Sequence, residues 1–301
     1  MPQATTNQCP DVVSTDAHVS AWSKAQEKTT AGKSGLHFGM FKAQAKDPEL
    51  AAFNASLRSV AYQTGHVPPR WKIGVDFQLL KRSNDYRAEK LRNILLLEAD
   101  QNQNYKQLGK DAMWQAERSG VTSAENYGGH KGHRAIEVSL NQRLTADLLR
   151  QKRKAAIICS NDAKGCFDRI VHMVAYIALR RFGIQRQPIL GMIRAIQEMT
   201  HHIRTAFGDS DATYGNDPSK PPLQGMLQGN GASGAAWAAV STLIVNVMKR
   251  AGFGFSTWSA IRKEAVEFVC YSFVDDASVL HSGPDNFTTG EDLVAQMPAV
   301  L

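Results

Sequence analysis

The sequence has few cysteines, and their spacing gives them no shared role. The four cysteines lie far apart, and no two are spaced as a C-x-x-C pair: Cys9, Cys159, Cys166 and Cys270. This argues against a zinc site and against the disulfide framework of a small secreted protein. The chain also has no run of 18 apolar residues for a membrane span and no basic-then-apolar signal pattern at its start. We therefore expect an intracellular protein, nuclear or cytoplasmic, with no membrane partner.

Positive charge is in excess. The 301 residues include 35 Lys and Arg against 28 Asp and Glu, which gives a formal net charge of +7. Such a balance favours nucleic acid or another polyanion as a partner. The run Lys152, Arg153 and Lys154 is a candidate nucleic-acid contact, and its alternative interpretation is the solvated end of a helix.

A pair of acids interrupts an apolar run. Asp275 and Asp276 lie in the middle of residues 268–280, where aromatic and β-branched side chains predict a strand, a turn and a second strand. Two adjacent carboxylates repel each other, and a bound divalent cation removes the conflict. Oxygen ligands on a tight turn suit Mg²⁺. The alternative is a solvated surface turn.

A third acid follows another short strand pattern. Residues 155–161 are mostly apolar, Asp162 comes directly after them, and a helical pattern follows at 169–182. Two-metal nucleotidyl transfer needs a cluster of carboxylates that holds two ions roughly 3.5–4 Å apart. We predict that Asp162, Asp275 and Asp276 converge on one site for two Mg²⁺ ions, with Mn²⁺ as a possible substitute.

Three motifs in order resemble the palm of reverse transcriptases. Residues 162–168 resemble the first palm motif, which begins with Asp and ends with Phe-Asp, and Phe273–Asp276 resembles the aromatic-x-Asp-Asp motif. Between them, residues 227–234 are similar to the Gln-Gly loop of the family. The Phe-Asp ending, and Phe before the acid pair, look more like the non-LTR retrotransposon and group II intron enzymes than the retroviral ones.

The resemblance implies roles for single residues. Asp162 and Asp275 would hold the metals, with Asp276 as a weaker or outer ligand. Gln228 and Gly229 would border the nascent base pair. Phe167 would lie under the incoming sugar and exclude a 2′-hydroxyl, and its alternative is a plain core residue.

Two segments upstream resemble the fingers strands of the same enzymes. These segments are residues 68–81 and 91–97, and they imply that Lys81 and Arg92 contact the incoming triphosphate. Fixed cations neutralise the charge of a polyphosphate. Asn93 stands where the family usually has Pro.

The likeness covers roughly residues 30–282 and implies an α+β fold. We expect a fingers–palm core whose antiparallel palm sheet is backed by helices. The expected parts are a mobile segment at 1–30, the fingers and the region before them at 31–150, the palm at 151–282, and a short tail at 283–301. That tail is too short for a thumb. Other patterns predict helices at 48–64, 110–118, 134–153, 187–200 and 232–250, a strand at 202–207 and a loop at 209–222.

The function that follows is RNA-directed DNA synthesis by a retroelement fragment. A primer 3′-hydroxyl would attack a dNTP on an RNA or DNA template, and a partner that supplies a thumb stays open. One alternative is an inactive nucleic-acid-binding remnant of a mobile element. Another is an RNA-dependent RNA polymerase, which Phe167 and the lack of Gly before the acid pair disfavour.

Overall fold

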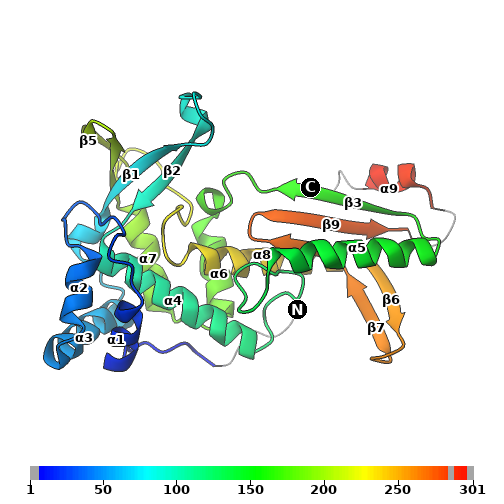
Figure 1. Cartoon of the computed structure of the whole chain (residues 1–301), viewed down its shortest axis with the longest axis horizontal. Coiled ribbons are helices and arrows are strands. Elements are labelled where there is room, and N and C mark those ends of the chain that lie inside the picture. Colours follow the sequence, from blue (N-terminus) through cyan, green and yellow to red (C-terminus); the bar gives the residue numbers. More distant parts are fainter. Residues whose placement is uncertain (1–6, 284–287, 297–301) are drawn as a thin grey trace. The chain divides into compact units, whose positions relative to one another are not determined.

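The computed structural model describes residues 7–283 and 288–296, and it has the predicted α+β class (Figure 1). The chain forms two compact units. The larger unit comprises Ala4–Ser119 and Phe167–Ala236, and the smaller unit comprises Gly120–Cys166 and the residues from Trp237 onward. These units divide the chain differently from fingers and palm, so the predicted boundaries at residues 30, 150 and 282 stay predictions.

The larger unit is built on a four-stranded sheet with the order β2-β1-β4-β5. Its strands are β1 (Ile73–Leu80), β2 (Leu91–Leu96), β4 (Thr200–Thr205) and β5 (Gly208–Tyr214). β1 pairs antiparallel with β2 and parallel with β4. The prediction of a loop from residue 209 is wrong for 209–214, because these residues form the edge strand β5. One contact that stabilises this polar strand is a 2.5 Å hydrogen bond that the Tyr214 hydroxyl donates to the buried Asp76 of β1.

Helices and short 3₁₀ turns make up the rest of this unit, and the helices pack mainly on one another. They are α1 (Thr15–Ser23), α2 (Phe38–Gln44), α3 (Pro48–Thr64), α4 (Ala99–Arg118), α6 (His172–Arg181), α7 (Arg186–Gln197) and the start of α8 (Ser233–Arg250), with 3₁₀ turns η1 (Pro69–Lys72), η2 (Ala88–Lys90) and η3 (Phe167–Arg169). α3 has the predicted bounds because local signals mark both ends. The Asp47 side chain caps its first turn, and Gly65 ends it at a φ of 68°.

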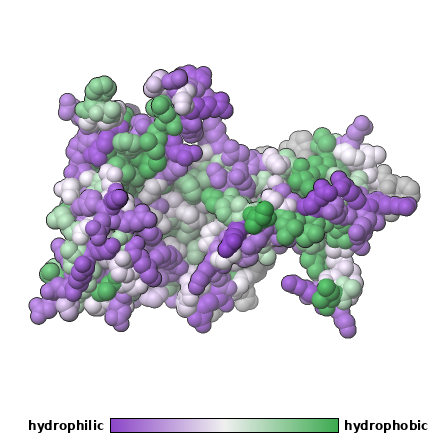
Figure 2. Space-filling view, viewed as in Figure 1, coloured by the Kyte–Doolittle hydropathy of each residue, from purple (hydrophilic) through white to green (hydrophobic). Residues whose placement is uncertain are grey.

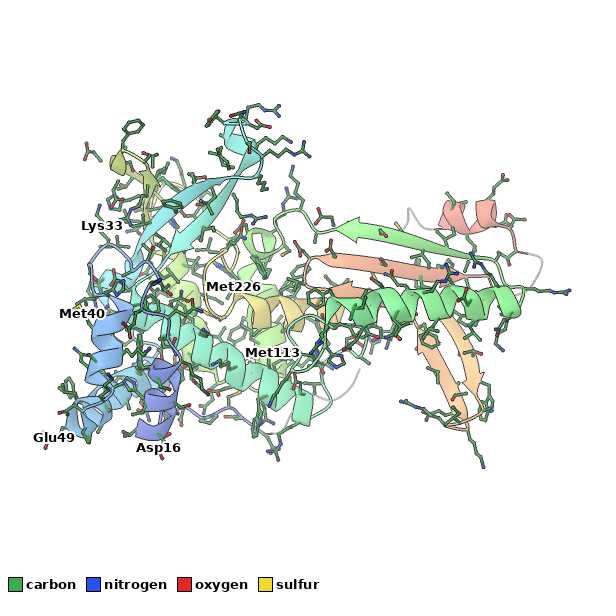
Figure 3. All side chains as sticks on the ribbon, viewed as in Figure 1. Asp16, Lys33, Met40, Glu49, Met113 and Met226 are labelled. Atoms are coloured by element: carbon green, nitrogen blue, oxygen red, sulfur yellow. The ribbon has the colours of Figure 1, made fainter. Side chains whose placement is uncertain are left out.

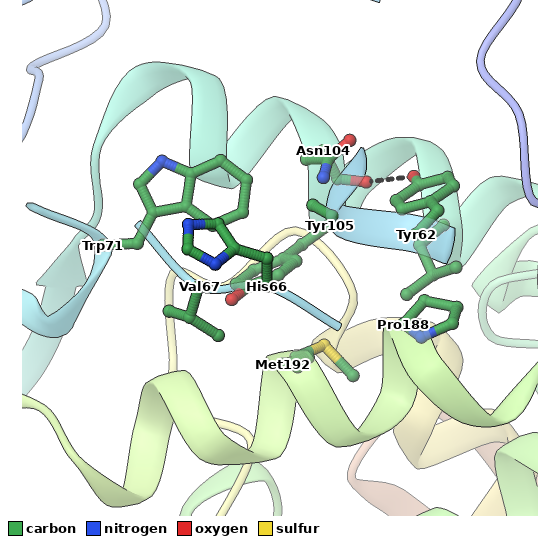
Figure 4. Close-up of a pocket in the computed structure, with 11 residues that line it drawn as sticks. Tyr62, His66, Val67, Trp71, Asn104, Tyr105, Pro188 and Met192 are labelled. Carbon is green, nitrogen blue, oxygen red and sulfur yellow. Dashed lines mark hydrogen bonds between the residues drawn. The ribbon is translucent and has the colours of Figure 1, made fainter. Parts of the chain in front are cut away.

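Two helices of this unit differ from expectation. The segment expected to be mobile contains α1, whose Trp22 is fully buried and stacks on Phe41 at 5.0 Å. α4 is much longer than the predicted 110–118, because its first half buries amide side chains such as Gln101 instead of apolar ones. Packing between α3, α4 and α7 is tight (Figure 4), and the cavity there measures only about 10 Å³. Such a cavity holds one water at most.

The smaller unit contains a three-stranded antiparallel sheet of order β3-β9-β8. Its elements are α5 (Ala135–Gln151), β3 (Ala156–Asp162), β6 (Phe255–Ser259), β7 (Glu264–Phe268), β8 (Cys270–Phe273), β9 (Asp276–Ser282) and α9 (Gly290–Gln296), together with α8 from Trp237. Val245 of α8 packs on Cys270 and Val279. Leu149 of α5 packs on Leu280, which alternation places on the opposite face. Helices therefore cover both faces of this sheet.

The surface of α5 carries an apolar stripe. Ile136, Leu140 and Leu144, spaced by one helical turn, are 69%, 55% and 56% exposed, and hydrophobic residues show among charged ones along this helix in Figure 2.

A helix that crosses a membrane must be both long and apolar. Within residues 7–283 and 288–296, no helix combines the length and apolarity that a membrane crossing requires.

Candidate functional site

The three predicted acids meet at one end of the sheet in the smaller unit. Asp162, the last residue of β3, is the direct cross-strand partner of Asp276, the first residue of β9. Directly opposed residues share a face, with Cβ atoms about 4.5–5.5 Å apart. The pairing continues one step further, because the Ala163 N–H donates to the carbonyl of Asp275 at 3.1 Å. All three acids are exposed, and in the part of the chain that the structure describes none forms an ion pair with Lys or Arg.

The turn that carries Asp275 is strained. β8 and β9 are joined by Val274 and Asp275 alone, and Phe273 pairs with Asp276 across the turn. Val274 has a φ of 56°, a left-handed conformation that is rare for a β-branched residue. Strain of this kind costs on the order of 1–3 kcal/mol and persists only where the surroundings enforce it. The indole N–H of Trp237 enforces it here by donating to the Val274 carbonyl at 2.5 Å.

A Gly-rich loop also contacts this turn. Residues 125–128 run beside β8, because Tyr127 N–H donates to the Ser272 carbonyl at 2.8 Å and Ser272 N–H donates to the Glu125 carbonyl at 2.9 Å. A Cβ atom on Gly128 would lie only 2.4 Å from the Val274 nitrogen. The need for Gly at position 128 comes from this contact, which appears only in three dimensions.

Gly128→Ala should therefore displace the acid-bearing turn. The added methyl group meets backbone that cannot rotate away, and overpacking of this kind costs about 1–3 kcal/mol. Chemical denaturation of the full chain should show this loss. Gly234→Ala is the matched control, because a Cβ at Gly234 in α8 meets nothing within 4 Å. Equal stability of both variants would show that the turn adapts freely.

The three acids offer the type of ligand atom that Mg²⁺ prefers, but the described structure does not arrange them as a three-residue metal site. Exposed carboxylates offer the oxygen ligands that Mg²⁺ prefers, and adjacent unpaired negative charges favour a cation. Among the described residues, however, no three His, Cys, Asp or Glu side chains stand close enough together to hold a metal ion. Asp162 and Asp276 are neighbours across the β3–β9 pair, whereas Asp275 lies in the turn before β9.

The residues predicted to meet the nucleotide lie in the larger unit. Phe167 begins η3, and its carbonyl accepts a 2.7 Å hydrogen bond from the N–H of Met226, a fully buried residue labelled in Figure 3. Two residues further, the Gln228 carbonyl accepts from Leu95 N–H of β2 at 2.8 Å. The Gln-Gly loop is thus held between η3 and β2, which brings Phe167 and Gln228 into adjoining segments.

Gly229 has a steric reason to be glycine. Its φ is 116°, and a Cβ atom at this position would lie 2.2 Å from the Leu95 carbonyl oxygen. Only Gly lets the loop approach β2 so closely. The position of Gly229 beside a nascent base pair stays a prediction.

Lys81 and Arg92 lie on the β1–β2 hairpin. Lys81 follows the last residue of β1, Arg92 pairs with Leu79 across the hairpin, and both side chains are exposed. Asp168, next to Phe167, is affected by the charge of Lys81 and by the backbone of the Gln-Gly loop. Burial raises the pKa of Asp168, while a hydrogen bond from the Gln228 backbone and the charge of Lys81 act in the opposite direction. The sequence pattern alone indicates no separate role for Asp168.

The basic run lies at the C-terminal end of α5 in the smaller unit. Lys152 caps the helix, and Arg153 adopts a left-handed φ of 52°. Cations at a helix C-terminus interact favourably with its dipole, so this placement has a structural explanation besides contact with nucleic acid.

Trp237 is the residue near the acids that the sequence analysis missed. It lies on a largely buried face of α8, where an aromatic side chain normally indicates core packing, and only the structure reveals its hydrogen bond to Val274. Comparison with known proteins adds no family assignment: no protein-family model matches the chain, and no curated protein matches it significantly.

Proposed function

We propose that this chain is the fingers–palm part of an RNA-directed DNA polymerase of the non-LTR retrotransposon or group II intron type. The observation that carries the proposal is the position of Asp162, Asp275 and Asp276 in the chain fold: all three lie at one end of an antiparallel sheet, two of them at a hairpin whose turn is strained. Strained backbone that the surrounding structure enforces is a feature of functional sites.

Asp162, Asp276 and Asp275 would hold two magnesium ions. The ions, once bound, would activate the primer 3′-hydroxyl and neutralise the leaving pyrophosphate. Lys81 and Arg92 would neutralise the triphosphate, Arg92 with the option of a bidentate contact. Phe167 would lie beneath the sugar, and the Gln228–Gly229 segment beside the base pair. The substrates would be dNTPs and an RNA or DNA template–primer.

An inactive nucleic-acid-binding remnant is the second candidate. One observation favours it: the acids do not form an assembled three-ligand group in the described residues. An RNA-dependent RNA polymerase is the third candidate function, and exclusion of ribonucleotides by Phe167 would argue against it.

Primer extension by the full chain separates these candidates. RNA and DNA templates are each paired with a labelled DNA primer, dNTPs or rNTPs, and Mg²⁺ or Mn²⁺. Extension with dNTPs on RNA supports the proposal. Tight template binding without extension under any condition supports the remnant, and extension only with rNTPs supports the RNA polymerase.

Lys81→Ala should weaken dNTP binding on the order of tenfold, because a hydrogen bond to a charged group contributes about 1.5–3 kcal/mol. Binding of a template–primer should change much less. Both affinities can be measured by fluorescence anisotropy, with labelled dNTP and labelled duplex. Arg82→Ala, an exposed cation one position further along the chain, is the control. A parallel loss of both affinities would instead make Lys81 a general phosphate contact.

A further inference from the structure

A polar pocket of about 300 Å³ lies in the larger unit, between the end of α1 and the first half of α4. Two lysines line it, Lys24 at the C-cap of α1 and Lys106 on α4, together with the polar side chains of Thr29 and Asn102. None of the predicted catalytic or nucleotide-binding residues lines this pocket. Its composition therefore calls for a separate explanation.

The positive charge around the pocket is concentrated. Lys110 lies one turn beyond Lys106 on α4; burial lowers its pKa, and the charges of Lys106 and Lys24 lower it further, so the three ammonium groups repel each other. Asp111 opposes this effect, but its carboxylate already accepts a 2.9 Å hydrogen bond from Gln107. Within the described ranges none of the three lysines forms an ion pair. A bound anion would relieve the repulsion.

Neutral donors complete the lining. The Oδ1 atom of Asn102 accepts a 2.8 Å hydrogen bond from Gly231 N–H, which leaves the Nδ2 amide group as the donor of this side chain. The hydroxyl of Thr29 is a further donor. Two ammonium groups with an amide and a hydroxyl suit a tetrahedral oxyanion such as phosphate, whose oxygens all accept hydrogen bonds.

The surroundings of the pocket indicate where the phosphate comes from. Gly231 packs directly on α4, because a Cβ atom there would lie 2.8 Å from both the Cβ and the nitrogen of Lys106. The same loop contains Gln228 and Gly229, the proposed neighbours of the base pair. The loop of Gln228 and Gly229 therefore adjoins the turn of α4 that carries Lys106.

We propose that the pocket of Lys24 and Lys106 binds a backbone phosphate of a nucleic-acid strand. The choice of nucleic acid over a free phosphate rests on the proposed function through the loop of Gln228. The pocket itself does not, since its charge and donors exist whether or not the chain is a polymerase.

The test measures binding of a labelled single-stranded RNA to the full chain at several salt concentrations. Loss of one phosphate contact lowers the slope of log K against log salt by about 0.7, which amounts to roughly fourfold in affinity near 0.15 M salt. Lys24→Gln combined with Lys106→Gln should show both changes. The control combines Lys46→Gln with Arg186→Gln, which removes the same charge from exposed positions of this unit outside the pocket, and it should show neither.

The outcomes separate the sources of the phosphate. An unchanged slope in the Lys24 and Lys106 variant, or an equal change in the control, overturns the proposal. Calorimetry with inorganic phosphate is the second arm: if the parent binds it and the double variant does not, while RNA affinity stays equal, the pocket takes a free anion and the backbone proposal fails. A parent that binds RNA through this pocket yet never extends a primer would refute the polymerase and leave the pocket standing.

Discussion

Asp275→Asn should reduce the rate of primer extension about a thousandfold while leaving the fold unchanged. The substitution keeps the size of the side chain and removes one of the three charges at the end of the sheet. Metal ions contribute several kcal/mol of transition-state stabilisation, and each 1.36 kcal/mol corresponds to tenfold in rate. The carbonyl of Asp275, which accepts from Ala163, is untouched. Single-nucleotide incorporation under saturating dNTP measures the effect.

The matched control is Asp147→Asn. Asp147 is a half-buried acid of α5 in the same unit, where it pairs with Arg143 and Arg150, and ion pairs close to the surface contribute little. Its loss should not alter the rate. If Asp275→Asn retained the parent rate in a chain that extends primers, the chemistry would lie elsewhere.

Phe167→Ala should raise incorporation of rNTPs relative to dNTPs by roughly tenfold or more. Discrimination by a shaped pocket is worth about 1–3 kcal/mol for a small group, and removal of the ring opens space for a 2′-hydroxyl. The ring is only partly buried, and no residue of η3 is fully buried, so the fold should tolerate the change. The ratio of kcat/KM for rNTP and dNTP is the measurement.

The opposite result would also be informative. If the preference for dNTPs survives, Phe167 is not the sugar selector. If the protein unfolds instead, the ring is a core residue. Either outcome removes the best single argument for DNA synthesis over RNA synthesis.

The strands and the turn that carry the three acids were predictable, because residues adjacent in the sequence determine each of them. Aromatic and β-branched residues around Asp275 predict β8, the turn and β9, and the short apolar run before Asp162 predicts β3. Their pairing followed from resemblance and not from pattern. Nothing in the sequence, however, predicted that a β-branched residue, Val274, would occupy the left-handed position of the turn.

The elements that the sequence did not predict, β5 and the first half of α4, have residues with little local preference for the structure they form. β5 is a polar edge strand with Asp and Ser, which are poor strand formers, and its pairing with β4 decides its conformation. The first half of α4 was missed because amide side chains such as Gln101 and Asn104 are buried there through hydrogen bonds, so apolar periodicity does not reveal the inner face. In both cases tertiary contacts outweigh local preference.

The pairing of β3 with β9 also determines when this chain can fold. Ser160 and Ser278, opposed in the two strands, are 118 positions apart in sequence. At about 5–20 residues per second, a ribosome needs roughly 6–24 s to add that many residues. Throughout this interval β3 has an unpaired edge, and unpaired edges recruit other strands. A nascent chain that stalls before β9 is synthesised would thus expose the unpaired edge of β3, and it would depend on chaperones to stay soluble.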